Sequence, residues 1–213
     1  MKTAILLGAT GMVGTALLKQ LLTNEEYSFV QIFVRRPTQL THYKLTEYVV
    51  DFNHPEQWAK LVQGDVLFSC LGTTLAVAGS KTNQYKVDFT YQYEMAKIAS
   101  ENSVKSLVLV SSAGAKASSG NFYLSMKGKL DETVQQFNFQ YVSILRPGQL
   151  YGNRIPKRPM EELALKIMFF INRIGLLRNY RPISADELAK AMLQVANSRK
   201  SGVYTLSNIF QIK

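Results

Sequence analysis

The sequence predicts an α/β fold with a doubly wound parallel sheet, and three observations support this class. The chain opens with an apolar run of strand length, a glycine-rich turn and a helical segment. Further short apolar runs then alternate with segments of helical character along the chain. Residues 107–110 are apolar throughout, as in a strand that is covered on both faces.

The predicted elements follow one another without a repeat or a flexible linker between them. The expected strands cover residues 3–7, 29–34, 48–50, 65–70, 106–110, 141–146 and 203–206. The expected helices cover residues 15–22, 55–60, 82–102, 122–137 and 160–174, with a last one after Ser184. A chain of 213 residues fits a single domain, in which we expect residues 151–213 to contribute a small cap on the substrate side.

The opening turn carries three glycines spaced G-x-x-G-x-x-G, between an apolar strand and a helix. Gly8 permits a tight turn, Gly11 lets the backbone approach a pyrophosphate, and Gly14 lets the helix pack on the strand. The N–H groups of the first helical turn then face the phosphates, together with the positive end of the helix dipole. The sequence therefore predicts nucleotide binding here, with a merely structural turn as the alternative. The predicted contacts are Gly8, Ala9, Thr10, Gly11, Met12, Val13 and Gly14.

Composition indicates an ordinary globular protein, with 46% apolar and 19% charged residues. The single cysteine, Cys70, excludes a disulfide framework and fits a reducing compartment. The apolar start is interrupted by Gly8 too soon for a secretion signal, so we expect a cytoplasmic protein. The formal charge of +10 comes from scattered Lys and Arg residues, a distribution that argues against nucleic-acid binding. Cofactor phosphates and an acidic substrate suffice to explain this charge.

The strand over 29–34 ends in Arg35 and Arg36, where a dinucleotide fold faces the adenosine ribose. Guanidinium groups bind phosphate oxygens in charge-assisted pairs, whereas a carboxylate at this point would repel a 2′-phosphate. The sequence therefore favours NADP over NAD, with a solvated basic turn as the alternative. Asp51 follows the next strand and is a candidate contact of the adenine.

Two histidines and the single tryptophan carry no predicted chemistry. Trp58 lies in the short helix expected over 55–60 and is expected to pack in the core. His42 and His54 lie in polar loops, away from any cluster of metal-ligand residues, so we expect no metal site.

Small residues follow the strand expected over 65–70, in the order Cys70, Leu71, Gly72 and Thr73. They would let the pyrophosphate and ribose pass close to the backbone at the carboxyl end of the sheet. We expect Cys70 to be a buried small hydrophobe rather than a nucleophile, because no histidine base accompanies it.

A second cluster of candidate residues follows the strand over 106–110. That strand ends in Ser111 and Ser112, and Tyr123 and Lys127 follow four residues apart, on one face of the expected helix. A phenol has a reference pKa of about 10, and a neighbouring ammonium is expected to lower it. A serine hydroxyl at the strand end would hold a substrate oxygen while the tyrosine gives or takes its proton.

At this point the chain resembles the atypical or extended short-chain dehydrogenase/reductase superfamily, which has an NAD(P)-binding Rossmann fold. It is most similar to the branch that contains the NmrA-like proteins and the Tat-interacting-protein oxidoreductases. The matching stretches are residues 8–14, 34–36, 50–52, 70–74, 110–115, 123–128 and 145–148.

The resemblance implies roles for individual residues. Tyr123 would be the general acid/base, and Lys127 would bind the nicotinamide ribose and lower the pKa of the tyrosine. Ser112 would orient the substrate, with Ser111 as the alternative. The cofactor would also contact Phe52, beside Asp51, Ser111, and the loop formed by Pro147 and Gly148.

The region after residue 150 is expected to form the substrate side of the cleft. Arg154, Lys157 and Arg158 are candidates to bind an anionic substrate, or form a solvated basic loop. The apolar helix over 160–174 is too short to span a bilayer and is interpreted as a lid, or as the contact surface of a homodimer or protein partner. Ser184 and Glu187 form the capping box of the last helix.

Together these features predict an NADP-dependent oxidoreductase that transfers a hydride between nicotinamide and a small carbonyl or alcohol substrate, with Tyr123 handling the proton. Two alternatives stay open. One is a non-catalytic NADPH-binding protein with a redox-sensing or regulatory role, since many members with this outline lack a working triad. The other is an NAD(P)-dependent epimerase or dehydratase, because the same tyrosine and lysine support these reactions.

Overall fold

The computed structural model describes residues 1–152 and 181–212. Within these ranges, seven strands pair in parallel to form one sheet with the order β3-β2-β1-β4-β5-β6-β9. The strands are β1 (Lys2–Leu7), β2 (Tyr27–Val34), β3 (Leu45–Val49), β4 (Val66–Ser69), β5 (Ser106–Val110), β6 (Tyr141–Arg146) and β9 (Gly202–Thr205). The strand order reverses between β1 and β4, and open α/β sheets bind ligands in the crevice at such a switch point. The predicted doubly wound parallel sheet is confirmed.

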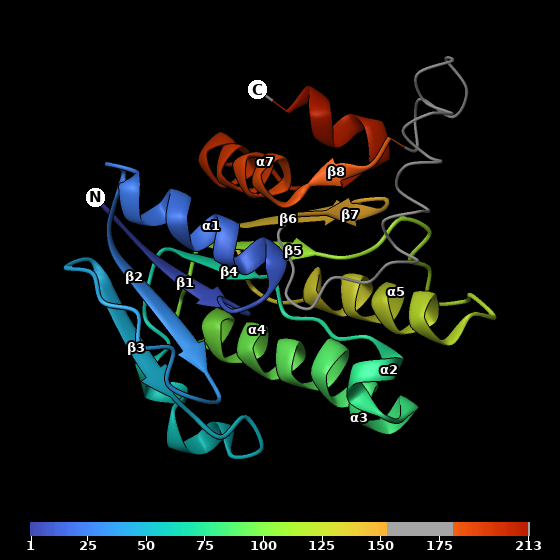
Figure 1. Cartoon of the computed structure of the whole chain (residues 1–213), viewed down its shortest axis with the longest axis horizontal. Helices are drawn as coiled ribbons and strands as arrows, with labels where there is room; N and C mark the ends of the chain where they lie inside the picture. The colour runs from blue at the N-terminus through green and yellow to red at the C-terminus, as the bar shows by residue number, and fades with distance from the viewer. Residues whose placement is uncertain (153–180, 213) are drawn as a thin grey trace.

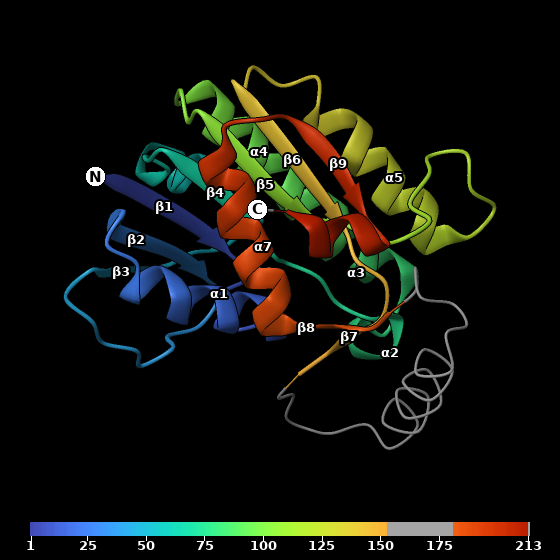
Figure 2. The same cartoon turned by 90° about the horizontal axis from the view of Figure 1, so that it is seen from above.

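Helices cover both faces of this sheet (Figure 1). One face carries α1 (Met12–Thr23) and α7 (Ala185–Ser198), which pack against each other, as Figure 2 shows from above. The other face carries α4 (Tyr91–Glu101) and α5 (Phe122–Val134). Two apolar cores result, one on each side of the sheet, and Leu6 and Ile5 of β1 are fully buried in the first and the second core respectively. This explains why the central strands are apolar on both faces.

Residues 181–212 are integral to the same fold. They supply α7 to one helix layer and β9 to the edge of the sheet, and Leu188 and Met192 are fully buried in the core beside α1. The described part of the expected cap therefore completes the domain. Residues 153–180, which include Arg154, Lys157, Arg158 and the apolar helix expected over 160–174, lie outside the described ranges.

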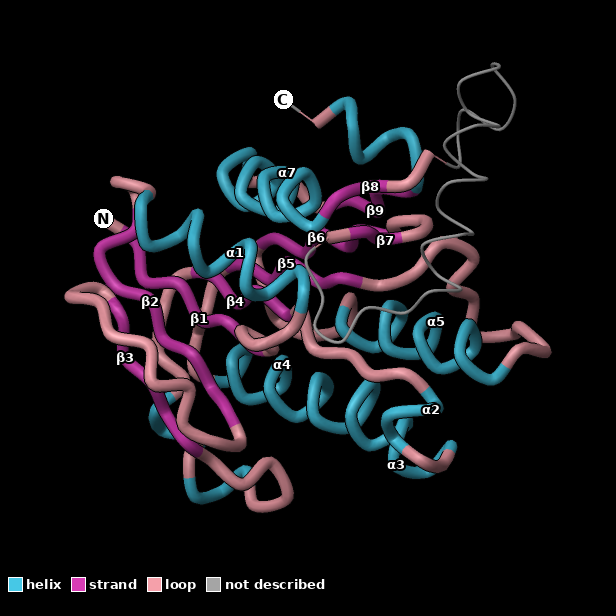
Figure 3. Tube along the Cα trace, in the orientation of Figure 1, coloured by secondary structure: helices cyan, strands magenta, loops and turns pink. Residues whose placement is uncertain are grey.

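Several local features differ from the expected elements (Figure 3). The helix expected over 82–102 consists of α3 (Lys81–Tyr85), a π-helical turn over Lys86–Thr90, and α4. The helix expected over 55–60 is replaced by two 3-10 turns, Pro55–Gln57 and Ala59–Leu61. Sequence reasoning did not predict the short helix α2 (Leu75–Ala78), the C-terminal 3-10 turns over Leu206–Gln211, or the two-stranded ribbon of β7 (Leu150–Tyr151) and β8 (Ile183–Ser184).

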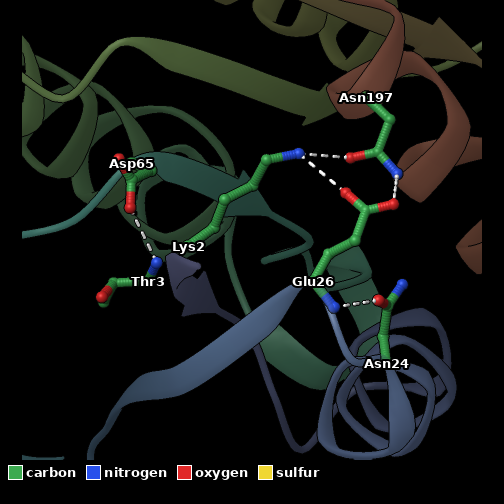
Figure 4. A network of polar contacts seen from close by, with 6 residues as sticks. All are labelled: Lys2, Thr3, Asn24, Glu26, Asp65 and Asn197. Carbon is green, nitrogen blue, oxygen red and sulfur yellow. Dashed lines mark hydrogen bonds and ion pairs between the residues drawn. The ribbon is translucent and has the colours of Figure 1, made fainter.

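A polar network fixes the amino ends of the strands, opposite the edge discussed below (Figure 4). The Lys2 ammonium donates to Glu26 Oε2 at 2.9 Å and to Asn197 Oδ1 at 2.8 Å, and Asn197 donates to Glu26 Oε1 at 3.0 Å. The backbone N–H of Thr3 donates to Asp65 Oδ2 at 2.8 Å. These contacts join β1, the start of β2, the end of α7 and the residue that precedes β4.

Candidate functional site

A cavity of about 860 Å³ lies at the carboxyl ends of the central strands. It is bounded by the turn after β1 and the start of α1, by the loop after β4, by the end of β5 and by α5. The ribbon of β7 and β8 and the first residues of α7 close another side. The predicted cofactor and catalytic residues that line it are Thr10, Gly11, Met12, Val13, Cys70, Leu71, Gly72, Thr73, Ser111, Tyr123 and Lys127.

The glycine turn is as tight as the sequence predicts. Gly8 has a φ of +88°, and a Cβ there would lie 2.7 Å from the carbonyl carbon of Cys70. A Cβ on Gly14 would lie only 2.0 Å from the carbonyl oxygen of Gly8, so a residue without a side chain is required where α1 crosses β1. No side chain among the described residues caps the start of α1. The N–H groups of its first turn are therefore available to an anion in the cavity.

Tyr123 lies at the cavity wall, in the first turn of α5, and is hydrogen-bonded to the Ser112 hydroxyl. Burial raises the pKa of Tyr123, as do the negative charges of Asp88 and Asp131, while the bond with Ser112 lowers it. The net direction is upward. The prediction that Lys127 lowers the tyrosine pKa is therefore wrong for this structure, because burial and the carboxylates outweigh any help from the ammonium.

Lys127 is 2% exposed and lies one helical turn beyond Tyr123. Its ammonium donates to the carbonyl oxygen of Val110 at 3.1 Å, at the end of β5. Burial lowers the pKa of Lys127, and the charges of Asp88, Asp131 and Cys70 act in the opposite direction. The spacing thus places the lysine beside the tyrosine as predicted, with its ammonium bound to the backbone.

The two serines after β5 have different partners. Ser111 donates its hydroxyl to Asp131 Oδ2 at 2.8 Å, and Arg146 Nε donates to the same oxygen at 2.8 Å. Asp131 is fully buried, and its desolvation raises the pKa of the carboxyl, although Ser111 and Arg146 act to lower it. Because Ser111 is bound to this carboxylate, Ser112 is the serine whose hydroxyl faces Tyr123. This arrangement favours the predicted choice of Ser112 over its alternative.

Some predicted contacts do not line the cavity. Gly8, Ala9 and Gly14 form the turn behind its wall, and Pro147 and Gly148 lie in the loop after β6, where the Pro147 carbonyl accepts from the Ala113 N–H at 2.9 Å.

The predicted adenosine contacts also lie away from the cavity wall. Arg35 and Arg36 are exposed just after β2. Asp51 is exposed and accepts from the Asn53 N–H at 2.9 Å, and this hydrogen bond is the main cause of its lowered pKa. The ring of Phe52 is buried against Trp58 and Tyr91, which leaves its backbone to meet a ligand.

Cys70 and the histidines have surroundings consistent with minor roles. Burial raises the pKa of the Cys70 thiol to about 12, and its sulfur lies 3.9 Å from that of Met192. Trp58 is 2% exposed and packs in the core as predicted. His54 is more than half exposed beside Glu56, and His42 accepts from the Lys44 N–H at 3.2 Å. No group of three His, Cys, Asp or Glu residues in the described chain could hold a metal ion.

Sequence reasoning missed part of the cavity wall. Asp88 lies in the π-helical turn and is 1% exposed, yet it lines the cavity. A carboxylate within an expected amphipathic helix gives no signal of this position. The other missed lining residues are Thr15, Ala16, Lys19, Thr74, Val110, Leu150, Tyr151, Gly152, Ser184, Ala185 and Asp186. In the described part of the chain, no helix has both the length and the apolar character needed to span a membrane.

Comparison with known proteins gives a family and close relatives. The family model described as NAD(P)H-binding matches residues 8–198. A protein of Aspergillus terreus named "Protein fmp52-1, mitochondrial" is 36% identical over 201 residues, covering 90% of this chain and 85% of its own length. A protein of Candida glabrata named "Protein FMP52, mitochondrial" is 35% identical over 202 residues, covering 92% of this chain and 85% of its own length.

These relatives correct one expectation. Their names place them in mitochondria, which contradicts the cytoplasmic location expected for this chain. That expectation depended on the lack of a recognisable secretion signal, a feature that does not distinguish between compartments inside a cell.

Solved structures share the fold at low identity. WbmH of Bordetella bronchiseptica, in complex with NAD+, has a TM-score of 0.73 at 16% identity and covers 96% of this chain and 75% of its own. UDP-glucose 4-epimerase of Thermus thermophilus, in complex with NAD, has a TM-score of 0.71 at 15% identity, covering 96% of this chain and 77% of its own. At this identity the likeness shows the Rossmann fold.

Proposed function

Because this chain belongs to the NAD(P)H-binding family and to the same family as the FMP52 proteins, we propose that it is an NADP-dependent oxidoreductase acting on a small carbonyl or alcohol substrate. The observation that carries this proposal is the hydrogen-bonded pair of Ser112 and Tyr123, at the wall of a cavity that begins at the glycine turn. When bound, the cofactor supplies hydride exchange at its nicotinamide ring. The protein supplies position and a proton.

The cavity gives each residue a distinct task. Ser112 and Tyr123 together bind a carbonyl oxygen, and Tyr123 donates its proton to that oxygen as it gains negative charge. Lys127 places a positive charge one helical turn away, where it stabilises the resulting phenolate. The raised pKa of Tyr123 keeps the phenol protonated at neutral pH, which suits the direction of carbonyl reduction.

The two proposed ends of the cofactor meet different parts of the chain. The pyrophosphate would lie against the first turn of α1, where the described residues provide no competing side-chain cap. The preference for NADP would come from Arg35 and Arg36, which are exposed at the end of β2 and free to bind a 2′-phosphate in bidentate fashion.

A paired fluorescence titration with NADPH and NADH tests the cofactor, followed by turnover of a panel of aldehydes, ketones and quinones. We expect NADPH to bind more tightly than NADH, and a double change of Arg35 and Arg36 to Ser to remove the difference. Tyr123→Phe should abolish turnover but leave NADPH binding within about twofold, because it removes a single hydroxyl. Tyr93→Phe, a half-buried tyrosine of α4 outside the cavity, is the matched control.

The outcomes separate the candidate functions. Tight NADPH binding without turnover of any carbonyl would favour the non-catalytic regulatory alternative. Failure of both nucleotides to bind would overturn the proposal as a whole.

A further inference from the structure

Asp88 occupies an unusual place in the helix layer beside the cavity. It is in the middle of the π-helical turn over Lys86–Thr90, and such turns are rare and frequently mark functional sites. The Asp88 carbonyl accepts from Gln92 Nε2 at 2.7 Å, and Gln92 in turn accepts from the Ser69 hydroxyl at 2.8 Å. All three side chains are at most 2% exposed. The turn is thus fixed to the end of β4 by a buried polar chain.

The carboxylate of Asp88 is directed at the loop after β4. Its Oδ2 accepts from the Thr73 N–H at 2.9 Å, and Gln84 supports the same residue by donating to the Thr73 carbonyl at 3.4 Å. A Cβ on Gly72 would lie 3.3 Å from Asp88 Oδ1, so a larger residue would crowd the carboxylate. Asp88 therefore holds the loop of residues 72–74, which forms part of the cavity wall.

The same carboxylate faces the buried ammonium of Lys127. The charged or titratable groups acting on Lys127 are Asp88 from the π-helical turn, Asp131 from α5 and Cys70 from the end of β4. Asp131 already pairs with Arg146 and Ser111. Among the described residues, Lys127 is the cation that acts on the pKa of Asp88. The two groups are 1% and 2% exposed, and buried charges are stable only when paired or well hydrogen-bonded.

We propose that Asp88 is a positioning residue of this site, which holds the 72–74 loop through the Thr73 N–H and balances the charge of Lys127. This role rests on the proposed oxidoreductase function for its catalytic consequence, since Lys127 must carry its charge to assist Tyr123. The two parts of the role are separable, because an asparagine keeps an oxygen for the Thr73 N–H and loses the charge.

The charge is tested on the protein without cofactor. Lysine labelled with ¹³C at Cε is titrated by NMR, and the Lys127 signal is assigned by its loss in Lys127→Met. Asp88→Asn should move the midpoint of Lys127 to lower pH by about one unit or more, as expected for loss of a close opposite charge. The matched control is Asp65→Asn, because Asp65 also accepts a backbone N–H at 2.8 Å but lies at the amino end of the sheet (Figure 4). It should leave the midpoint unchanged.

The loop is tested by hydrogen exchange at the Thr73 amide. Asp88→Ala should accelerate this exchange at least about fivefold, the loss of one net hydrogen bond, whereas Asp88→Asn should change it less than twofold or so. Where turnover is measurable, the alkaline limb of kcat/KM in Asp88→Asn should move to lower pH together with the Lys127 midpoint.

Each result decides a stated point. An unchanged Lys127 midpoint in Asp88→Asn would overturn the charge role, and unchanged Thr73 exchange in Asp88→Ala would overturn the loop role. Both readouts work without cofactor or substrate, so they remain decisive if the wild-type protein fails to bind NADPH and the proposed function fails with it.

Discussion

Replacing Gly14 by Ala tests the close approach between α1 and the opening turn. A Cβ at this position would lie 2.0 Å from the Gly8 oxygen, 2.7 Å from the Gly8 carbonyl carbon and 3.0 Å from the Ala9 Cα. Comfortable contacts between such atoms begin at about 3.5 Å, so α1 must move by roughly 1.5 Å relative to the turn. All three atoms belong to the backbone and cannot rotate away. We expect a loss of about 3 kcal/mol in the free energy of unfolding, at the upper end of overpacking costs.

The displacement also moves the N–H groups at the start of α1 away from a bound phosphate. Loss of one charge-assisted hydrogen bond costs about 1.5–3 kcal/mol, so NADPH should bind at least about tenfold more weakly. Urea unfolding followed by circular dichroism gives the stability, and NADPH fluorescence gives the affinity.

Gly120→Ala is the control, because a Cβ on Gly120 would meet nothing within 4 Å. This change should leave affinity unaltered and stability equal or slightly higher. If Gly14→Ala matched the wild type in both measurements, the inferred contact between α1 and the turn would be refuted.

Three further predictions concern single groups. Arg146→Met leaves the fully buried Asp131 without its cation and should lower the free energy of unfolding by about 3–5 kcal/mol in urea denaturation; a loss under about 1 kcal/mol would contradict the inferred pairing. The Cys70 thiol, with its pKa raised to about 12, has only about one part in ten thousand as thiolate at pH 8, so native protein should react with iodoacetamide far more slowly than urea-unfolded protein, as followed by mass spectrometry. The rate should rise with pH, and equal rates in the two states would show that the thiol is accessible. Ser184→Ala removes the capping box in which Ser184 Oγ accepts from the Glu187 N–H at 3.1 Å, and a loss of about 1 kcal/mol in thermal unfolding is expected, whereas no change would mean that the helix start is held by other contacts.

Strand positions were predictable because burial on both faces leaves a direct pattern in the residues. The strands at 106–110 and 141–146 match the expected bounds, and the capping box of Ser184 and Glu187 is present as predicted. The π-helical turn was not predictable, because one widened turn leaves the apolar periodicity of the surrounding helix almost intact.

The electrostatics of the tyrosine were also beyond the reach of spacing. A four-residue interval shows that Lys127 and Tyr123 share a helix face, but it does not show that the ammonium donates to the Val110 carbonyl. Nor does it reveal Asp88, which is far away in the sequence and raises the tyrosine pKa from across the cavity. Burial and long-range charge, which only the folded chain brings together, decide the direction.

The same reasoning bears on the formal charge of +10. Cofactor phosphates and an acidic substrate were expected to explain it, which would require the excess cations to gather in the cavity. The charged residues in the described cavity wall are Lys19, Lys127, Asp88 and Asp186, which balance each other. Attraction of an anionic ligand to this part of the site must therefore come from the helix start and from individual hydrogen bonds, whose strength salt screens less than it screens exposed charges. NADPH affinity should accordingly fall by less than about tenfold between 50 mM and 500 mM salt, and a steeper loss would assign the main attraction to exposed residues such as Arg35 and Arg36.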